Sequence, residues 1–260
     1  MARALFFVAA AAACCLSAQP AAPQTDREFD CYVQSAEARM AARQPLQTAD
    51  AMRNIQTVPG NGPNPHKIPG AMIYDWIGTI FIPGATVDRT IHMLQDYDHR
   101  PLYFPETISN ARLLCREGEN RFGFSMRLKE PAVIDSENDV VWERLDARHW
   151  RCRSYSTQVH EIGKQHNYLL RLNSYWRFAE TGRGVLVEGQ AITLSGEFGS
   201  LMRTLGSLAG INPEKSLKKT LASMRESLEK PGLQFSAPPA NIAACGPPVA
   251  APACSLQSRR

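Results

Sequence analysis

Six consecutive segments within residues 106–195 alternate apolar and polar residues with a period of two, the pattern of half-buried β-strands. Only short turn segments separate them, and connections of hairpin length join antiparallel neighbours. The pattern therefore predicts an antiparallel meander whose strands pair in the order of the chain. Within residues 167–178, one parity is mainly apolar and the other carries Arg171, Asn173 and Arg177. We expect one buried and one solvated face, as an antiparallel sheet allows.

Further elements flank this meander. Residues 71–84 form an apolar, β-branched run that predicts one more strand, which makes a sheet of seven strands. Two short helical patterns follow this strand, at residues 85–98 and 98–104. After the meander, Asn212 and Pro213 predict the start of a long amphipathic helix. Its apolar side chains are Leu217, Leu221, Met224 and Leu228, and a shorter apolar row precedes it at Leu201, Leu205 and Leu208.

The order of these elements resembles the START-like, or Bet v 1-like, helix-grip superfamily, which includes polyketide cyclases and lipid-transfer proteins. The likeness is strongest in WIGTIFIPGATVDRTIHMLQDYDHRPLYFP, residues 76–105, and covers residues 68–230. It implies an α+β fold in which a curved, seven-stranded antiparallel sheet wraps around the long C-terminal helix, with two short helices after the first strand. It also implies a hydrophobic pocket between the sheet and the helix.

Aromatic side chains are expected to face this pocket, because small lipophilic ligands bind in apolar cavities with few polar groups. The predicted ligand-binding residues are Tyr97, Tyr103 and Phe104 near the mouth, with Phe122, Phe124, Trp142, Tyr168, Trp176, Phe178, Glu188 and Leu205. The alternative for the apolar members is that they fill a solid core. For Glu188, the alternative is exposure on the solvated face or pairing with an arginine of a neighbouring strand, such as Arg171 or Arg177.

Residues 1–18 predict a secretory signal, with Arg3 as its basic region, a short apolar run and cleavage after Ala18. The run is short for a membrane span, although a genuine anchor and a lipoprotein signal at Cys14 are the alternatives. Export predicts a secreted or periplasmic protein. We expect four parts in the chain: the signal peptide at 1–18, an N-terminal helical extension with a Pro/Gly linker at 19–67, the START-like domain at 68–230, and a flexible Ala/Pro-rich tail at 231–260.

The chain has seven cysteines, two of which leave with the signal. The odd number that remains means that at least one has no disulfide partner within the chain. Cys245 and Cys254 are close enough in sequence to close a local loop. Cys115 and Cys152 lie three strands apart in the predicted meander, which is about 14 Å, whereas a disulfide needs Cα atoms within about 7 Å. We therefore expect that Cys115 and Cys152 do not bridge each other.

No motif for catalysis or metal binding is complete in this sequence. His160 and Glu161, followed by His166, depart from the HExxH zinc motif in spacing, and neighbours on a strand face opposite sides. We expect no metal, no cofactor and no catalytic residue, although several carboxylates could act as acids or bases if they face the pocket: Asp75, Asp96, Asp98, Glu143 and Glu188. The formal net charge of +4 gives no strong nucleic-acid footprint.

The sequence therefore predicts a secreted, monomeric protein that binds a hydrophobic small molecule or lipid, with no nucleic-acid partner and no integral membrane span. Enzymatic activity stays open, with simple binding preferred. The first alternative is a cyclase or aromatase-type enzyme acting on a polyketide-like substrate. The second is an envelope interaction module with a filled core. Two or more polar groups that converge deep in the pocket would favour the enzyme.

Overall fold

The computed structural model describes residues 23–43, 51, 54–129, 133–163, 168–196 and 212–254. These residues form a nine-stranded sheet with the order β1-β3-β9-β8-β7-β6-β5-β4, in which β2 pairs with β3. The strands are β1 Gln56–Pro59, β2 His66–Ile68, β3 Ala71–Pro83, β4 Ile108–Glu117, β5 Arg121–Leu128, β6 Ile134–Arg144, β7 His149–Glu161, β8 Leu169–Thr181 and β9 Gly184–Gly196. Strands β4 to β9 pair in chain order, so the predicted antiparallel meander is confirmed.

The sheet has nine strands instead of the predicted seven because β1 and β2 lie in the segment that was expected to be a linker. The proline and glycine residues of this segment lie at a strand end or in the turns between the strands. Pro59 is the last residue of β1, and Gly70, at φ 73°, makes the turn between β2 and β3. Proline and glycine in such positions form tight turns, and the short strands between these turns can still pair with a neighbouring strand.

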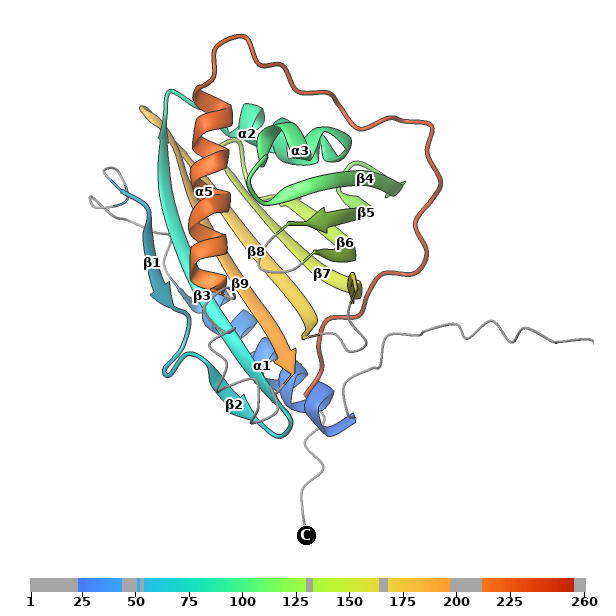
Figure 1. The fold of residues 1–260 in the computed structure, drawn as a ribbon. Helices are drawn as coiled ribbons and strands as arrows, with labels where there is room; N and C mark the ends of the chain where they lie inside the picture. Colours follow the sequence, from blue (N-terminus) through green and yellow to red (C-terminus); the bar gives the residue numbers. More distant parts are fainter. Residues whose placement is uncertain are drawn as a thin grey trace, which may run out of the picture.

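One face of the sheet, called here the inner face, packs against the C-terminal helix α5 Pro213–Glu229 (Figure 1). The side chain of Asn212 caps this helix by accepting a hydrogen bond from Lys215 N at 3.0 Å. All four of the apolar positions predicted for the helix are buried: Leu217, Leu221, Met224 and Leu228. The short helices after β3 are α2 Val87–Gln95, η1 Tyr97–His99 and α3 Arg100–Tyr103. The predicted α+β helix-grip architecture is therefore confirmed.

Helix α5 approaches β3 closely at Gly78. A Cβ atom on this residue would lie 2.6 Å from Leu221 Cδ1 and 3.0 Å from Leu217 Cγ, both on α5. Only a residue without a side chain lets the helix lie this near to the strand. The contact fixes α5 against one side of the sheet, which leaves room above strands β5 to β8.

The opposite, outer face of the sheet is covered by helix α1 Pro23–Ala42, which is visible behind the strands in Figure 1. Phe29 and Val33 of this helix are fully buried against a second apolar cluster that includes Ile192 and Leu194. The expectation of a solvated outer face is wrong for this region, because the predicted exposed position Asn173 has no accessible surface. The helix expected in the N-terminal extension thus forms a third layer of the fold.

The tail after α5 crosses the molecule and is held to it by both disulfides (Figure 1). Cys245 bridges to Cys115 on β4, and Cys254 bridges to Cys31 on α1. The expected local loop between Cys245 and Cys254 is therefore wrong. Cys152 is buried and free, so the prediction that Cys115 and Cys152 do not bridge is confirmed. Two cross-links make the tail part of the folded body, where a flexible segment was expected.

The apolar row at Leu201, Leu205 and Leu208, the predicted signal and His166 lie outside the described residues. Among the helices that the structure describes, none is long and apolar enough to cross a membrane.

Candidate ligand cavity

A cavity of about 240 Å³ lies between the inner face of the sheet and α5. Most of its wall is apolar, and the aromatic side chains come from β5, β6, β8 and the residues that follow α3 or precede β8. Its lining residues are Leu94, Arg100, Phe104, Thr107, Ile108, Phe124, Met126, Leu128, Ile134, Asn138, Val140, Trp142, Cys152, Ser154, Glu161, Tyr168, Leu169, Leu172, Ser174, Trp176, Ala191, Thr193, Ser195, Pro213, Ser216, Leu217, Thr220 and Met224. Since ligand pockets are typically about 300–1,000 Å³, this cavity suits a small ligand.

Five of the predicted ligand-binding residues line this cavity: Phe104, Phe124, Trp142, Tyr168 and Trp176. Four others pack in the surrounding core without lining it: Tyr97, Tyr103, Phe122 and Phe178. Leu205 lies outside the described residues. Contact with a ligand stays a prediction for all of these residues.

The two tyrosines that were expected at the mouth lie instead in the packed wall around the cavity. Tyr97 is 1% exposed, and its hydroxyl accepts a hydrogen bond from Trp142 Nε1 at 3.0 Å. Tyr103 donates to Asp96, which also accepts from Ser236 N of the tail at 2.8 Å. Each buried hydroxyl thus has a partner, as burial requires. Tyr97 thereby fixes the orientation of Trp142, which does line the cavity.

A row of hydroxyl side chains on the sheet also lines the cavity, and the sequence analysis did not single it out. Ser154 on β7 lies opposite Ser174 on β8, and Thr193 lies opposite Leu172 one row further along. The Thr193 hydroxyl is buried without a hydrogen-bond partner among the described residues. The signal in the sequence was present, because Ser154 and Ser174 occupy the same strand parity as the apolar residues that face inward.

Cys152 lies between Trp142 and Trp176 in the strand register and faces the cavity. Burial in apolar surroundings raises the pKa of its thiol to about 12. The thiol is therefore protonated at neutral pH, and a protonated thiol is a poor nucleophile. This residue contributes apolar surface and a small side chain to the wall.

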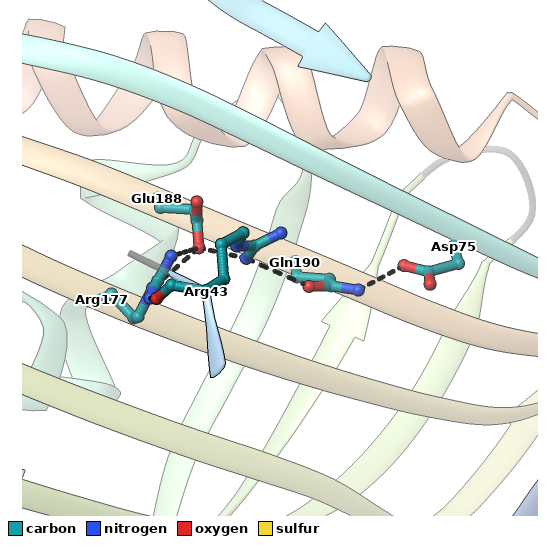
Figure 2. Close-up of polar contacts among 5 residues, drawn as sticks. All are labelled: Arg43, Asp75, Arg177, Glu188 and Gln190. Atoms are coloured by element: carbon teal, nitrogen blue, oxygen red, sulfur yellow. Dashed lines mark hydrogen bonds and ion pairs between the residues drawn. The ribbon is translucent and has the colours of Figure 1, made fainter. Parts of the chain in front are cut away.

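Glu188, which was predicted as a ligand-binding residue, lies on the outer face and does not line the cavity. Figure 2 shows its carboxylate between Arg43 and Arg177, with N···O distances of 2.5 and 2.7 Å. Arg43 also reaches Gln190, which donates a hydrogen bond to Asp75 at 2.7 Å. Pairing with an arginine of a neighbouring strand, the alternative for Glu188, is therefore confirmed. The cluster joins the end of α1 to the centre of the sheet.

Metal binding has no support in the described part of the chain, which contains no group of three or more His, Cys, Asp or Glu side chains able to hold an ion. On β7, His160 is exposed while its neighbour Glu161 is buried, as expected for adjacent strand positions. Glu161 accepts hydrogen bonds from Tyr168 N and Leu169 N, both at 2.7 Å, so backbone groups hold its carboxylate in place.

No family model and no curated protein matches this chain. Among solved structures, it is similar to a STAR-related lipid transfer protein from Xanthomonas axonopodis, with 16% identity and a TM-score of 0.48 over 64% of this chain and 97% of that one. It is similar to the major latex-like protein 151 of Panax ginseng, with 12% identity and a TM-score of 0.43 over 61% and 99%.

A third similar structure is the di-domain ARO/CYC protein BexL from the BE-7585A biosynthetic pathway. The identity is 16% and the TM-score 0.42, over 61% of this chain and 50% of that one. At these identities, the likeness concerns the fold alone. Because one fold hosts many functions, the function of this chain depends on the chemistry of its own cavity.

Proposed function

We propose that this protein binds a small hydrophobic molecule or lipid in the cavity between α5 and the sheet. The observation that carries the proposal is a cavity inside the core whose wall is mostly apolar, with Trp142, Trp176 and Phe124 among its lining residues. Well-packed cores leave few voids larger than a water molecule, whereas binding proteins keep such space for a ligand. The cavity also argues against the module with a filled core.

Native mass spectrometry of the mature protein, followed by organic extraction, tests this proposal. We expect an adduct of small mass that the solvent removes. The variant Ala191→Phe should lose the adduct, because Ala191 lines the cavity on β9 and a phenyl ring would occupy it. The matched control is Ala38→Phe, since Ala38 is exposed on α1 and the change is chemically identical. An adduct that survives in Ala191→Phe, or a wild-type protein that takes up no apolar ligand, would refute binding in this cavity.

A cyclase or aromatase-type activity on a polyketide-like substrate is the second candidate. The hydroxyls of Ser154, Ser174 and Thr193 on neighbouring strands are the observation in its favour, because they could orient a substrate carbonyl. The extracted ligand distinguishes the two functions. An enzyme would convert added substrate into a product with multiple turnovers, whereas a binding protein would return the ligand unchanged.

We also propose that the protein is exported and works as a monomer. Two disulfides support export, because such bonds persist in oxidising compartments. The cavity is formed within one chain, which supports a monomer. The intact mass of the purified protein tests processing: cleavage after Ala18 gives one mass, and a lipid-modified Cys14 gives another. Light scattering after size exclusion tests the oligomeric state.

The START-like domain at 68–230 is proposed as the ligand-binding unit. Helix α1 and the tail, which Cys31–Cys254 joins to each other, would then form an outer layer that Cys115–Cys245 fastens to it. Because both bridges reach outside residues 68–230, we expect the isolated segment to be less stable than the whole chain. Thermal unfolding of the two proteins would check this division.

A further inference from the structure

The cavity wall in the described residues carries two charged side chains, Arg100 and Glu161. The carboxylate of Glu161 already accepts two backbone hydrogen bonds. The guanidinium of Arg100 has no comparable anion, because no described carboxylate lies within ion-pair distance of it and none contributes to its electrostatic environment. Arg100 is thus a cation at the wall of an apolar cavity, with no counter-charge among the described residues.

The residues around Arg100 hold its guanidinium in a fixed position. Its Nη2 donates to Leu94 O at 2.8 Å, and its Cζ lies 4.6 Å from the ring centre of Tyr97 and 4.4 Å from that of Phe124. The aromatic faces offset part of the cost of burial. They leave hydrogen-bonding capacity unused, since Nε is buried with no partner in the described part of the chain and a guanidinium has five N–H donors.

The missing counter-charge is an energetic cost that a ligand can remove. Burial lowers the pKa of Arg100, but an arginine side chain remains protonated in proteins. A buried charge is stabilised when an opposite charge pairs with it and satisfies its donors. A carboxylate fits best, because its two oxygens match the planar guanidinium fork.

Arg100 on α3 lies near the start of β7, whereas Glu161 is the last residue of that strand, and this arrangement orients such a ligand. Arg100 interacts with Cys152, whereas Glu161 follows nine residues later on the same strand. At about 3.3 Å per residue, these positions are separated by about 30 Å of strand. A carboxylate is attracted to the Arg100 end and repelled from the Glu161 end. Apolar lining between the two comes from Val140 and Leu172.

We infer that the ligand is an amphiphile with a carboxylate headgroup, which Arg100 binds, and an apolar chain that extends along the inner face of the sheet past Val140 and Leu172. The inference rests on the proposed function, because it names the class of ligand for the same cavity.

Isothermal titration with decanoate and with decanol tests the headgroup, since the two probes share one chain. We expect decanoate to bind about tenfold to one-hundredfold more tightly to the wild type, the effect of a charge-assisted hydrogen bond. Arg100→Met should abolish this preference and leave the affinity for decanol nearly unchanged. Arg100→Lys should keep part of the preference, because it retains the charge and loses the fork. The matched control is Arg112→Met, an exposed position on β4 that does not line the cavity.

The ratio of the two affinities separates a headgroup contact from structural damage. Equal losses for decanoate and decanol in Arg100→Met would mean that Arg100 only supports the fold, and they would overturn the inference. A wild type that binds both probes equally would also overturn it while the cavity function stands. If neither probe binds the wild type, the proposed function itself fails. Should Arg100→Met not fold, Arg100→Lys and its affinity ratio decide the question.

Discussion

Replacing the Cys115–Cys245 disulfide with two serines should destabilise the protein through its unfolded state. The bridge joins β4 to the tail across a sequence separation of 130 residues. The other bridge, Cys31–Cys254, closes a ring of 223 residues that contains the first. In the unfolded chain, Cys115–Cys245 therefore divides an existing ring into one arm of 130 residues and one of the remaining 93.

The ring sets the size of the effect. In a Gaussian chain, the two arms act together as a single loop of about 54 residues, and closing such a loop corresponds to about 4 kcal/mol at 25 °C. Without Cys31–Cys254, the same bridge closes the full loop of 130 residues, which corresponds to about 5 kcal/mol. Cys115→Ser/Cys245→Ser should therefore lower the free energy of unfolding by about 1 kcal/mol more in a protein whose Cys31 and Cys254 are already serines than in the wild type.

Urea unfolding of the four proteins in this cycle, without reductant, measures both values. The control repeats the comparison with all disulfides reduced, where the cross-link no longer distinguishes the proteins. There the wild type and the serine variants should differ by less than about 0.5 kcal/mol. A loss below about 1 kcal/mol in the oxidised proteins, or a loss that persists after reduction, would show that loop closure is not what the bridge contributes.

Three further perturbations test other parts of the structure. Gly78→Ala should lower the free energy of unfolding by about 1–3 kcal/mol, because the new Cβ would lie 2.6 Å from Leu221. The control is Gly182→Ala, where a Cβ has no atom within 4 Å and the loss should be far smaller. Urea titrations of the two variants and the wild type measure the difference. Burial raises the pKa of Asp75, so its folded pKa lies above the unfolded value and its contribution to stability falls as pH rises from the unfolded pKa through the folded one. In Asp75→Asn, the free energy of unfolding should no longer show this decrease between acidic and neutral pH. If its dependence on pH is the same as in the wild type, Asp75 is not the group responsible. The thiol of Cys152, with a pKa of about 12, should react with iodoacetamide about a thousandfold more slowly than a cysteine with the reference pKa of 9.0. Mass spectrometry of the native protein measures the rate of alkylation. Labelling of Cys152 as fast as in the unfolded chain would disprove the prediction.

The local pattern of the sequence predicted strands β3 to β9 and helix α5, because these elements depend on neighbours along the chain. Period-two alternation in β4 to β9 and the cap at Asn212 are local signals, and the structure reproduces them. The inward aromatic residues of the cavity followed from the same parity, as with Phe124 and Trp176. Strand parity does not show whether an inward side chain lines free space or packs against another side chain. Phe122 and Phe178, which pack in the core, were therefore predicted together with the residues that line the cavity.

The features that the sequence analysis missed depend on contacts between distant segments. Polar residues such as Asn173 and Gln190 resemble a solvated face until α1 covers them. Cys31 and Cys254 carry no mark of their pairing, since a separation of 223 residues has no local pattern. Arg100 carries no signal in the sequence, and only its position over the ring of Phe124 brings it to the cavity wall.

The tail has a second consequence at the edge of the sheet. An unpaired edge strand is a template for another chain, and it leads to polymers when it is long and open. On β4, Leu113 N donates to Asp98 and Arg116 N donates to Ala243 O of the tail, so edge amides are already occupied. At the other end, β1 is only four residues long and stops at Pro59, which has no N–H to offer. Both margins of the sheet thus carry features that disfavour the addition of another strand.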